Sequence, residues 1–97
     1  MFLSNGEDAM SIHGADIQQL RDLSAKFSTQ AGNLSTLIGG LQTATHSSES
    51  YWKGPAADRF RNEWSQLKPT FDKFVTTLHD ASKSAKTNAD NIEAATR

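Results

Sequence analysis

The side chains that could do chemistry in this sequence are three histidines and many hydroxyl groups. His13, His46 and His79 are widely and evenly spaced, whereas the ligands of a metal site usually recur at close spacing on one face. The serines lack a G-x-S-x-G nucleophile elbow, and the glycines form no phosphate-binding loop. Zero cysteines exclude a thiol nucleophile and thiolate metal sites. We therefore expect no catalytic residues, no metal site and no cofactor, and hence no enzyme.

Length and charge restrict the remaining classes of protein. A chain of 97 residues forms one domain at most. With 10 Lys+Arg against 11 Asp+Glu it has no basic stripe for nucleic acid. The first residues do not have the pattern of a secretory signal peptide, and no apolar run is long enough to span a bilayer. Taken alone, these features predict a cytoplasmic interaction protein.

The elements that must position any functional residue are two amphipathic helices. Apolar residues recur at alternating three- and four-residue steps in two long segments. The chain has only two prolines, whereas a β-sandwich would show a turn signal about every ten residues. We expect an all-α domain with a flexible lead-in at 1–10, helix one at 11–46, a turn at 47–54, helix two at 55–84, and a frayed or disordered tail at 85–97. A turn this short makes the two helices antiparallel.

The apolar stripes are wider than one hairpin can cover. Leu23, Leu37 and Val75 lie beside the inner seam, so apolar surface should stay open on one face. Pairing two hairpins into a four-helix bundle would cover that face. The side chains expected to pack within or between hairpins are Leu20, Phe27, Leu34, Leu41, Phe60, Trp64, Leu67, Phe71, Phe74 and Leu78.

Three features of the helices carry further expectations. Pro55 suits the first position of helix two, because its missing N–H would be unpaired there. Pro69 lies inside the second stripe and predicts a kink or a loosened turn just before it. The Gly39-Gly40 pair predicts a close contact between helices.

Trp52 and Gly54, in the turn, admit two interpretations. Trp52 could fold back over the end of the hairpin as a structural side chain, with Gly54 supplying a permissive backbone. Alternatively, a half-exposed Trp52 could be the contact that another protein recognises. The residue types alone favour the structural interpretation, because a Trp near a turn is common in cores.

A Trp-x-Gly tripeptide between two amphipathic helices resembles the WXG family of small type VII (ESX-type) secretion substrates. Residues 52–64, which read WKGPAADRFRNEW, resemble its actinobacterial members, as do residues 14–21, GADIQQLR. The resemblance implies an antiparallel hairpin that dimerises with itself or with a paralogous WXG-type hairpin. It also implies export through an ATPase-driven, signal-peptide-independent membrane machine. The chain would then be cytoplasmic before export and secreted or at the cell surface afterwards.

The resemblance further implies a two-part export signal. Trp52 and Gly54 match the turn half, whereas the other half, a Tyr-x-x-x-Asp/Glu in a C-terminal tail, has no match because no tyrosine follows Tyr51. Either a paralogous partner carries that tyrosine, or this chain uses a divergent tail around Ile92 and Glu93, where Ile92 is the one large apolar residue after Leu78.

Two other functions stay open at this stage. One is an intracellular four-helix-bundle scaffold that is never exported. The other is a membrane-active secreted effector, although the polar faces of the helices are mixed in sign rather than rich in Lys and Arg.

Overall fold

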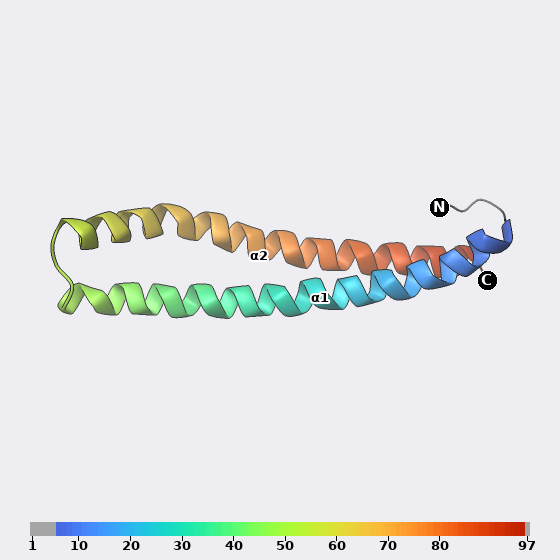
Figure 1. The fold of residues 1–97 in the computed structure, drawn as a ribbon, viewed down its shortest axis with the longest axis horizontal. Coiled ribbons are helices and arrows are strands. Elements are labelled where there is room, and N and C mark those ends of the chain that lie inside the picture. Colours follow the sequence, from blue (N-terminus) through green and yellow to red (C-terminus); the bar gives the residue numbers. More distant parts are fainter. Residues whose placement is uncertain (1–5, 97) are drawn as a thin grey trace. The chain divides into compact units, whose positions relative to one another are not determined.

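The computed structural model describes the backbone of residues 6–96 and the side chains of residues 16–96. Over this range the chain forms two long α-helices, α1 (Gly6–Ser47) and α2 (Pro55–Thr96), with a short 3-10 helix, η1 (Ser48–Ser50), after α1 (Figure 1). The all-α prediction is confirmed. The described chain divides into two compact units, one built from residues up to Thr29 together with those from His79 onward, and one built from Gln30–Leu78.

The unit that contains both chain ends is held by small and polar side chains. Ser24 and Ser82 bond reciprocally, each hydroxyl donating to the other residue's backbone carbonyl at 2.7 Å. Ala85 and Ala89 of α2 are buried. Side chains this small let two helix backbones approach closely, which strengthens their dispersion contacts.

The prediction of a frayed or disordered tail at 85–97 is wrong, because α2 does not end at residue 84 but continues to Thr96. The last turns are helical because Ala89 is fully buried and Arg21 of α1 holds Asp90 and Glu93 of α2, each at 2.8 Å. Lys86 adds an i,i+4 pair to Asp90 at 3.3 Å. Residues 85–96 are therefore part of the packed hairpin.

The start of helix one also differs from the prediction. Helix α1 begins at Gly6, so residues 6–10, expected to be a flexible lead-in, are helical; residues 1–5 lie outside the described part. At its other end α1 reaches Ser47, one residue beyond the expected end.

The unit that contains the turn has a larger apolar core. Ala31 and Ile38 of α1 and Ala57 and Trp64 of α2 are buried there.

The exposed Pro69 lies inside α2, and the helix continues through it without interruption. In the unit with the chain ends, Arg21 contacts Asp90 and Ser24, further along α1, contacts Ser82, earlier in α2, so the helices are antiparallel there. In the unit with the turn, Gln42 contacts Trp64 and the later Ser48 contacts the earlier Arg61, which gives the same direction.

The predicted packing side chains differ in burial within this single chain. Trp64 is buried, whereas half-buried positions are Leu20, Phe27, Leu34, Phe71 and Leu78. Exposed positions are Leu41, Phe60, Leu67 and Phe74, and Leu23 and Leu37 are exposed as well. The hairpin therefore leaves large apolar side chains in contact with solvent.

The glycine pair in α1 does not make the expected close contact. Gly39 and Gly40 are exposed, and a Cβ at either position would meet nothing within 4 Å. The prediction of a close helix contact at this pair is wrong.

Candidate functional site

The turn between the helices is built by backbone hydrogen bonds and one glycine. The Ser48 carbonyl accepts hydrogen bonds from the N–H groups of Tyr51, at 3.1 Å, and Trp52, at 2.8 Å. Gly54 has φ +112°, a backbone conformation that disfavours side chains. Its carbonyl accepts from the Asp58 N–H at 3.0 Å, which is the first hydrogen bond of α2. The chain therefore leaves η1, reverses at Gly54 and enters α2 with Pro55 at its first position.

Trp52 is held at the surface of this turn. Its side chain is 40% exposed, against 6% for Trp64, the other tryptophan. The Phe60 ring lies 5.8 Å from the Trp52 ring in a tilted arrangement. The Arg61 guanidinium lies 5.9 Å from the ring centroid, within cation–π range. The indole is thus oriented by two residues of α2 and still open to another molecule.

Arg61 links α2 to the other side of the turn. Its Nη2 donates to the Trp52 carbonyl oxygen and its Nη1 to Ser48 Oγ, both at 2.9 Å. Ser48 is buried, and its hydroxyl in turn donates to the Thr45 carbonyl at 2.6 Å. Asp58 lies 3.8 Å from Nη2. The Arg61 side chain therefore bonds to η1 and to the turn at once, and Ser48 links it to the Thr45 carbonyl near the end of α1.

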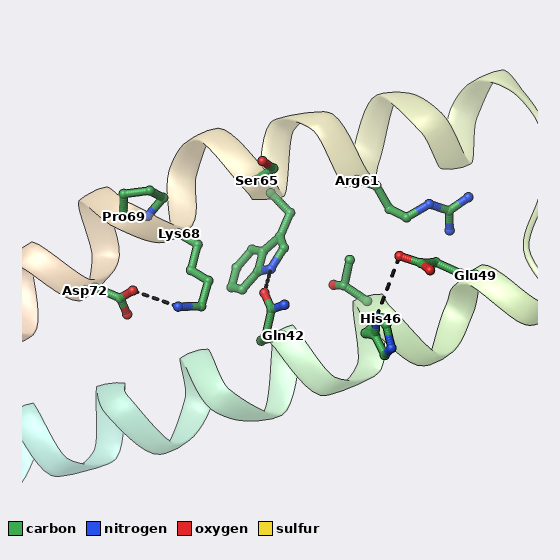
Figure 2. Close-up of a pocket in the computed structure, with 10 residues that line it drawn as sticks. Gln42, His46, Glu49, Arg61, Ser65, Lys68, Pro69 and Asp72 are labelled. Atoms are coloured by element: carbon green, nitrogen blue, oxygen red, sulfur yellow. Dashed lines mark hydrogen bonds and ion pairs between the residues drawn. The ribbon is translucent and has the colours of Figure 1, made fainter.

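A groove between the helices lies next to this turn, and Figure 2 shows the residues that line it. On its floor the Trp64 indole N–H donates to Gln42 Oε1 at 2.7 Å. At its edge Lys68 pairs with Asp72 at 2.7 Å, and His46 Nδ1 lies 3.8 Å from a carboxylate oxygen of Glu49 (Figure 2). The paired charges and mixed signs give the groove no preference for a cation or an anion.

The histidines whose side chains the structure describes belong to no group that could hold a metal ion. His46 faces Glu49, His79 is exposed, and the side chain of His13 lies outside the described residues. Among the described residues, no three His, Asp or Glu side chains are placed to hold a metal ion.

The predicted tail residues lie in the other unit, against α1. Ile92 is half-buried and lines a shallow hollow with Leu20 and Leu23. Glu93 accepts from Arg21 at 2.8 Å. Two hydrogen bonds lower the pKa of the Asp90 carboxyl, a larger effect from Arg21 and a smaller one from Lys86.

The site contains residues that sequence patterns did not single out. Phe60 was expected to be a packing side chain, and its ring lies against Trp52. Arg61 and Ser48 were not among the residues expected to form the site. Phe60 lies in the second turn of α2, only eight residues after Trp52, and this short separation was the available signal. No sequence signal indicated the hydrogen bonds of Arg61 to a backbone carbonyl and a hydroxyl group.

Comparisons with known proteins agree with this geometry. The model of the WXG100 family, described as proteins of 100 residues with WXG, matches residues 14–96. The chain is 22% identical to Protein YukE of Bacillus subtilis (strain 168) over 76 residues, which is 78% of each chain. Its fold is similar to that of Geobacillus thermodenitrificans EsxA, with a TM-score of 0.76 and 22% identity over 81% of this chain and 88% of that one. The helices of the described part include none that is long and apolar enough to cross a membrane.

Proposed function

This chain belongs to the WXG100 family, and from that premise we propose that it is a non-enzymatic substrate or adaptor of a type VII secretion system. It acts as a dimer of helical hairpins, with a second copy or with a paralogous WXG-type hairpin. It is cytoplasmic before export and reaches the cell surface or the medium without a signal peptide. Its further partner is the secretion ATPase of the membrane machine.

The observation that carries this proposal is the Trp-x-Gly turn. Trp52 is 40% exposed although it is the largest apolar side chain of the turn, and it is oriented by Phe60 and Arg61. A structural staple would gain most free energy by full burial. An aromatic side chain that is oriented and still accessible suits recognition by another protein, so we assign the turn half of the export signal to Trp52 and Gly54.

Pairing of hairpins is supported by the apolar side chains that the single chain leaves exposed. Leu37 is 58% exposed and Phe74 51%, and Leu41 and Leu67 are exposed as well. Burying such side chains contributes about 1.5–3 kcal/mol each. A second hairpin would cover them.

The tail half of the signal has two candidate sources. Ile92 and Glu93 could form a divergent signal, but Ile92 is half-buried and Glu93 is bonded to Arg21. A tail held in this way is less accessible to the ATPase, which favours a paralogous partner that supplies the tyrosine.

The proposal is tested by comparing the two tryptophans. Trp52→Ala should reduce the amount of protein in the culture supernatant while the protein keeps its helical content and its dimer. Trp64→Ala should destabilise the fold, because Trp64 is buried. If Trp52→Ala is exported like the unmodified chain, Trp52 is not an export signal.

The pairing is tested by light scattering coupled to size-exclusion chromatography, with circular dichroism on the same peak. A helical species near twice 10.6 kDa would establish a homodimer. A poorly folded monomer or an aggregate would show that the exposed face belongs to a different chain.

A further inference from the structure

We infer that Arg61 is a positioning residue for the export-signal turn: its guanidinium fixes the backbone and the ring of Trp52 so that the half-exposed indole is presented in one orientation. This inference rests on the proposed function, because it requires that Trp52 be read by another protein. It goes further by assigning the orientation of Trp52 to a residue outside the Trp-x-Gly tripeptide.

The first step of the argument is the geometry of the guanidinium. Its two terminal nitrogens donate to acceptors on different segments, Ser48 Oγ in η1 and the Trp52 carbonyl after it, both at 2.9 Å. A planar guanidinium can serve two such acceptors at once, and hydrogen bonds from a charged donor are stronger than neutral ones. A lysine ammonium is a point charge on a flexible stem and does not reproduce this fork.

The second step is the burial of the Arg61 side chain and of Ser48, one of its two acceptors. The Arg61 side chain is only 19% exposed, so its hydrogen bonds are less screened than those of an ordinary surface arginine. Ser48 is buried, and its hydroxyl is fixed by the bond to the Thr45 carbonyl. Arg61 is therefore attached to a rigid point at the end of α1.

The third step is how little else orients the indole. Residues 52 and 53 are outside any helix. The Trp52 N–H is bonded to the Ser48 carbonyl, which fixes one side of the residue but not its carbonyl or its ring. Arg61 bonds the carbonyl and lies over the ring, while Phe60 contacts the ring from the same helix. Without Arg61 the peptide after Trp52 loses its link to α2, and the indole can sample more orientations.

Arg59 provides a matched control within the same helix. It carries the same charge two residues earlier and is exposed, and it takes no part in the contacts of Trp52 described above. Substituting Arg59→Gln or Arg61→Gln changes the net charge equally. A difference between these two variants therefore measures the effect of the two hydrogen bonds of Arg61 and not the effect of its charge.

The experiment uses the full chain labelled with 5-fluorotryptophan, so that Trp52 and Trp64 give separate fluorine NMR resonances. Trp52→Phe assigns the signals. Arg61→Gln should move the Trp52 resonance and increase its H2O/D2O isotope shift, which reports solvent exposure, while the Trp64 resonance stays in place. Export measured in the same host should fall by at least about tenfold, the loss expected for one hydrogen bond from a charged donor. Arg59→Gln should change neither quantity.

Two further variants separate positioning from folding. Arg61→Lys keeps the charge but not the planar guanidinium that donates to two acceptors, and it should behave like Arg61→Gln. Full export by Arg61→Lys would overturn the inference. Ser48→Ala removes one acceptor and leaves Arg61 in place. It should move the Trp52 resonance in the same direction by a smaller amount, which keeps the inference testable if Arg61→Gln folds poorly.

The outcomes for export distinguish this inference from the function on which it rests. If Trp52→Ala blocks export while Arg61→Gln is exported normally, the positioning role is wrong and the proposed function stands. If Trp52→Ala is exported normally, both are wrong. If Arg61→Gln leaves the Trp52 resonance unchanged, the positioning role is wrong whatever the export result.

Discussion

Replacement of Trp64 by alanine tests whether the core of the turn-containing unit is assigned correctly. Trp64 is 6% exposed, its ring lies 6.1 Å from that of Phe71, and its N–H donates to Gln42 at 2.7 Å. Trp64→Ala removes the largest buried side chain of this unit and leaves a cavity between α1 and α2.

The expected cost follows from these contacts. Truncating a buried tryptophan to alanine costs about 3–5 kcal/mol, including the cavity. The lost bond to Gln42 adds little, because Gln42 is exposed and water can replace the indole. A chain of 97 residues has a free energy of unfolding of about 5–15 kcal/mol. Trp64→Ala should therefore remove a large part of the stability, whereas Trp64→Phe, which keeps an aromatic ring, should cost about 1–2 kcal/mol.

The assay is urea unfolding followed by far-UV circular dichroism at one fixed protein concentration, because association would shift the transition. Trp52→Ala is the matched control. It loses a half-exposed ring, the contact with Phe60 and the cation–π contact with Arg61, and these two contacts together contribute about 1–2.5 kcal/mol, less than the cost expected for Trp64→Ala. Equal costs for Trp52→Ala and Trp64→Ala would refute the division between a recognition tryptophan and a core tryptophan.

Three further predictions concern the tail, the turn and helix α2. The lowered pKa of Asp90 means that its pair with Arg21 stabilises the fold above the ordinary aspartate pKa and is lost as the pH falls through the lower folded value; Asp90→Asn should remove this part of the acid dependence of the urea midpoint. Gly54→Ala should destabilise by about 1–2 kcal/mol in urea unfolding through its backbone alone, since φ is +112° and a Cβ would meet nothing within 4 Å. Pro69→Ala should raise the thermal midpoint, because a proline inside a helix costs up to about 3 kcal/mol and Pro69 is exposed; a lower midpoint would show that Pro69 has a packing role.

The sequence was informative wherever one strong local signal was present. The four-heptad stripe around Trp64 and the proline at position 55 indicate a long second helix and its start, and α2 begins at Pro55. The wide stripes indicate apolar side chains left open, and Leu37 and Phe74 are exposed. These features depend on residues near one another in the chain, which periodicity can detect.

The features that the sequence did not reveal depend on contacts between distant residues. The end of α2 was placed too early because its packing uses Ala85 and Ala89, which are too small to give a clear apolar stripe. Ser24 interrupted the stripe of α1, yet it is buried and bonded to Ser82. The bonds of Arg21 to the tail could not be foreseen from spacing, because its partners lie at the other end of the chain.

The same limit applied to the site. The tripeptide identified Trp52 and Gly54 as the residues to examine, but the role of Arg61 depends on where a backbone carbonyl and a hydroxyl group lie after folding. Neither the type of Arg61 nor its spacing from Trp52 indicates these two acceptors.

The most direct test of the central claim is the amount of this chain in the culture supernatant of its host, measured with and without the gene for the secretion ATPase. A cytoplasmic marker protein measured in the same samples controls for lysis. Export by a type VII system predicts that the chain is present in the supernatant of the intact strain, is absent without the ATPase, and returns when the gene is restored. Equal amounts in both strains, or none in either while the cells contain the protein, would contradict the proposed function and favour the intracellular scaffold.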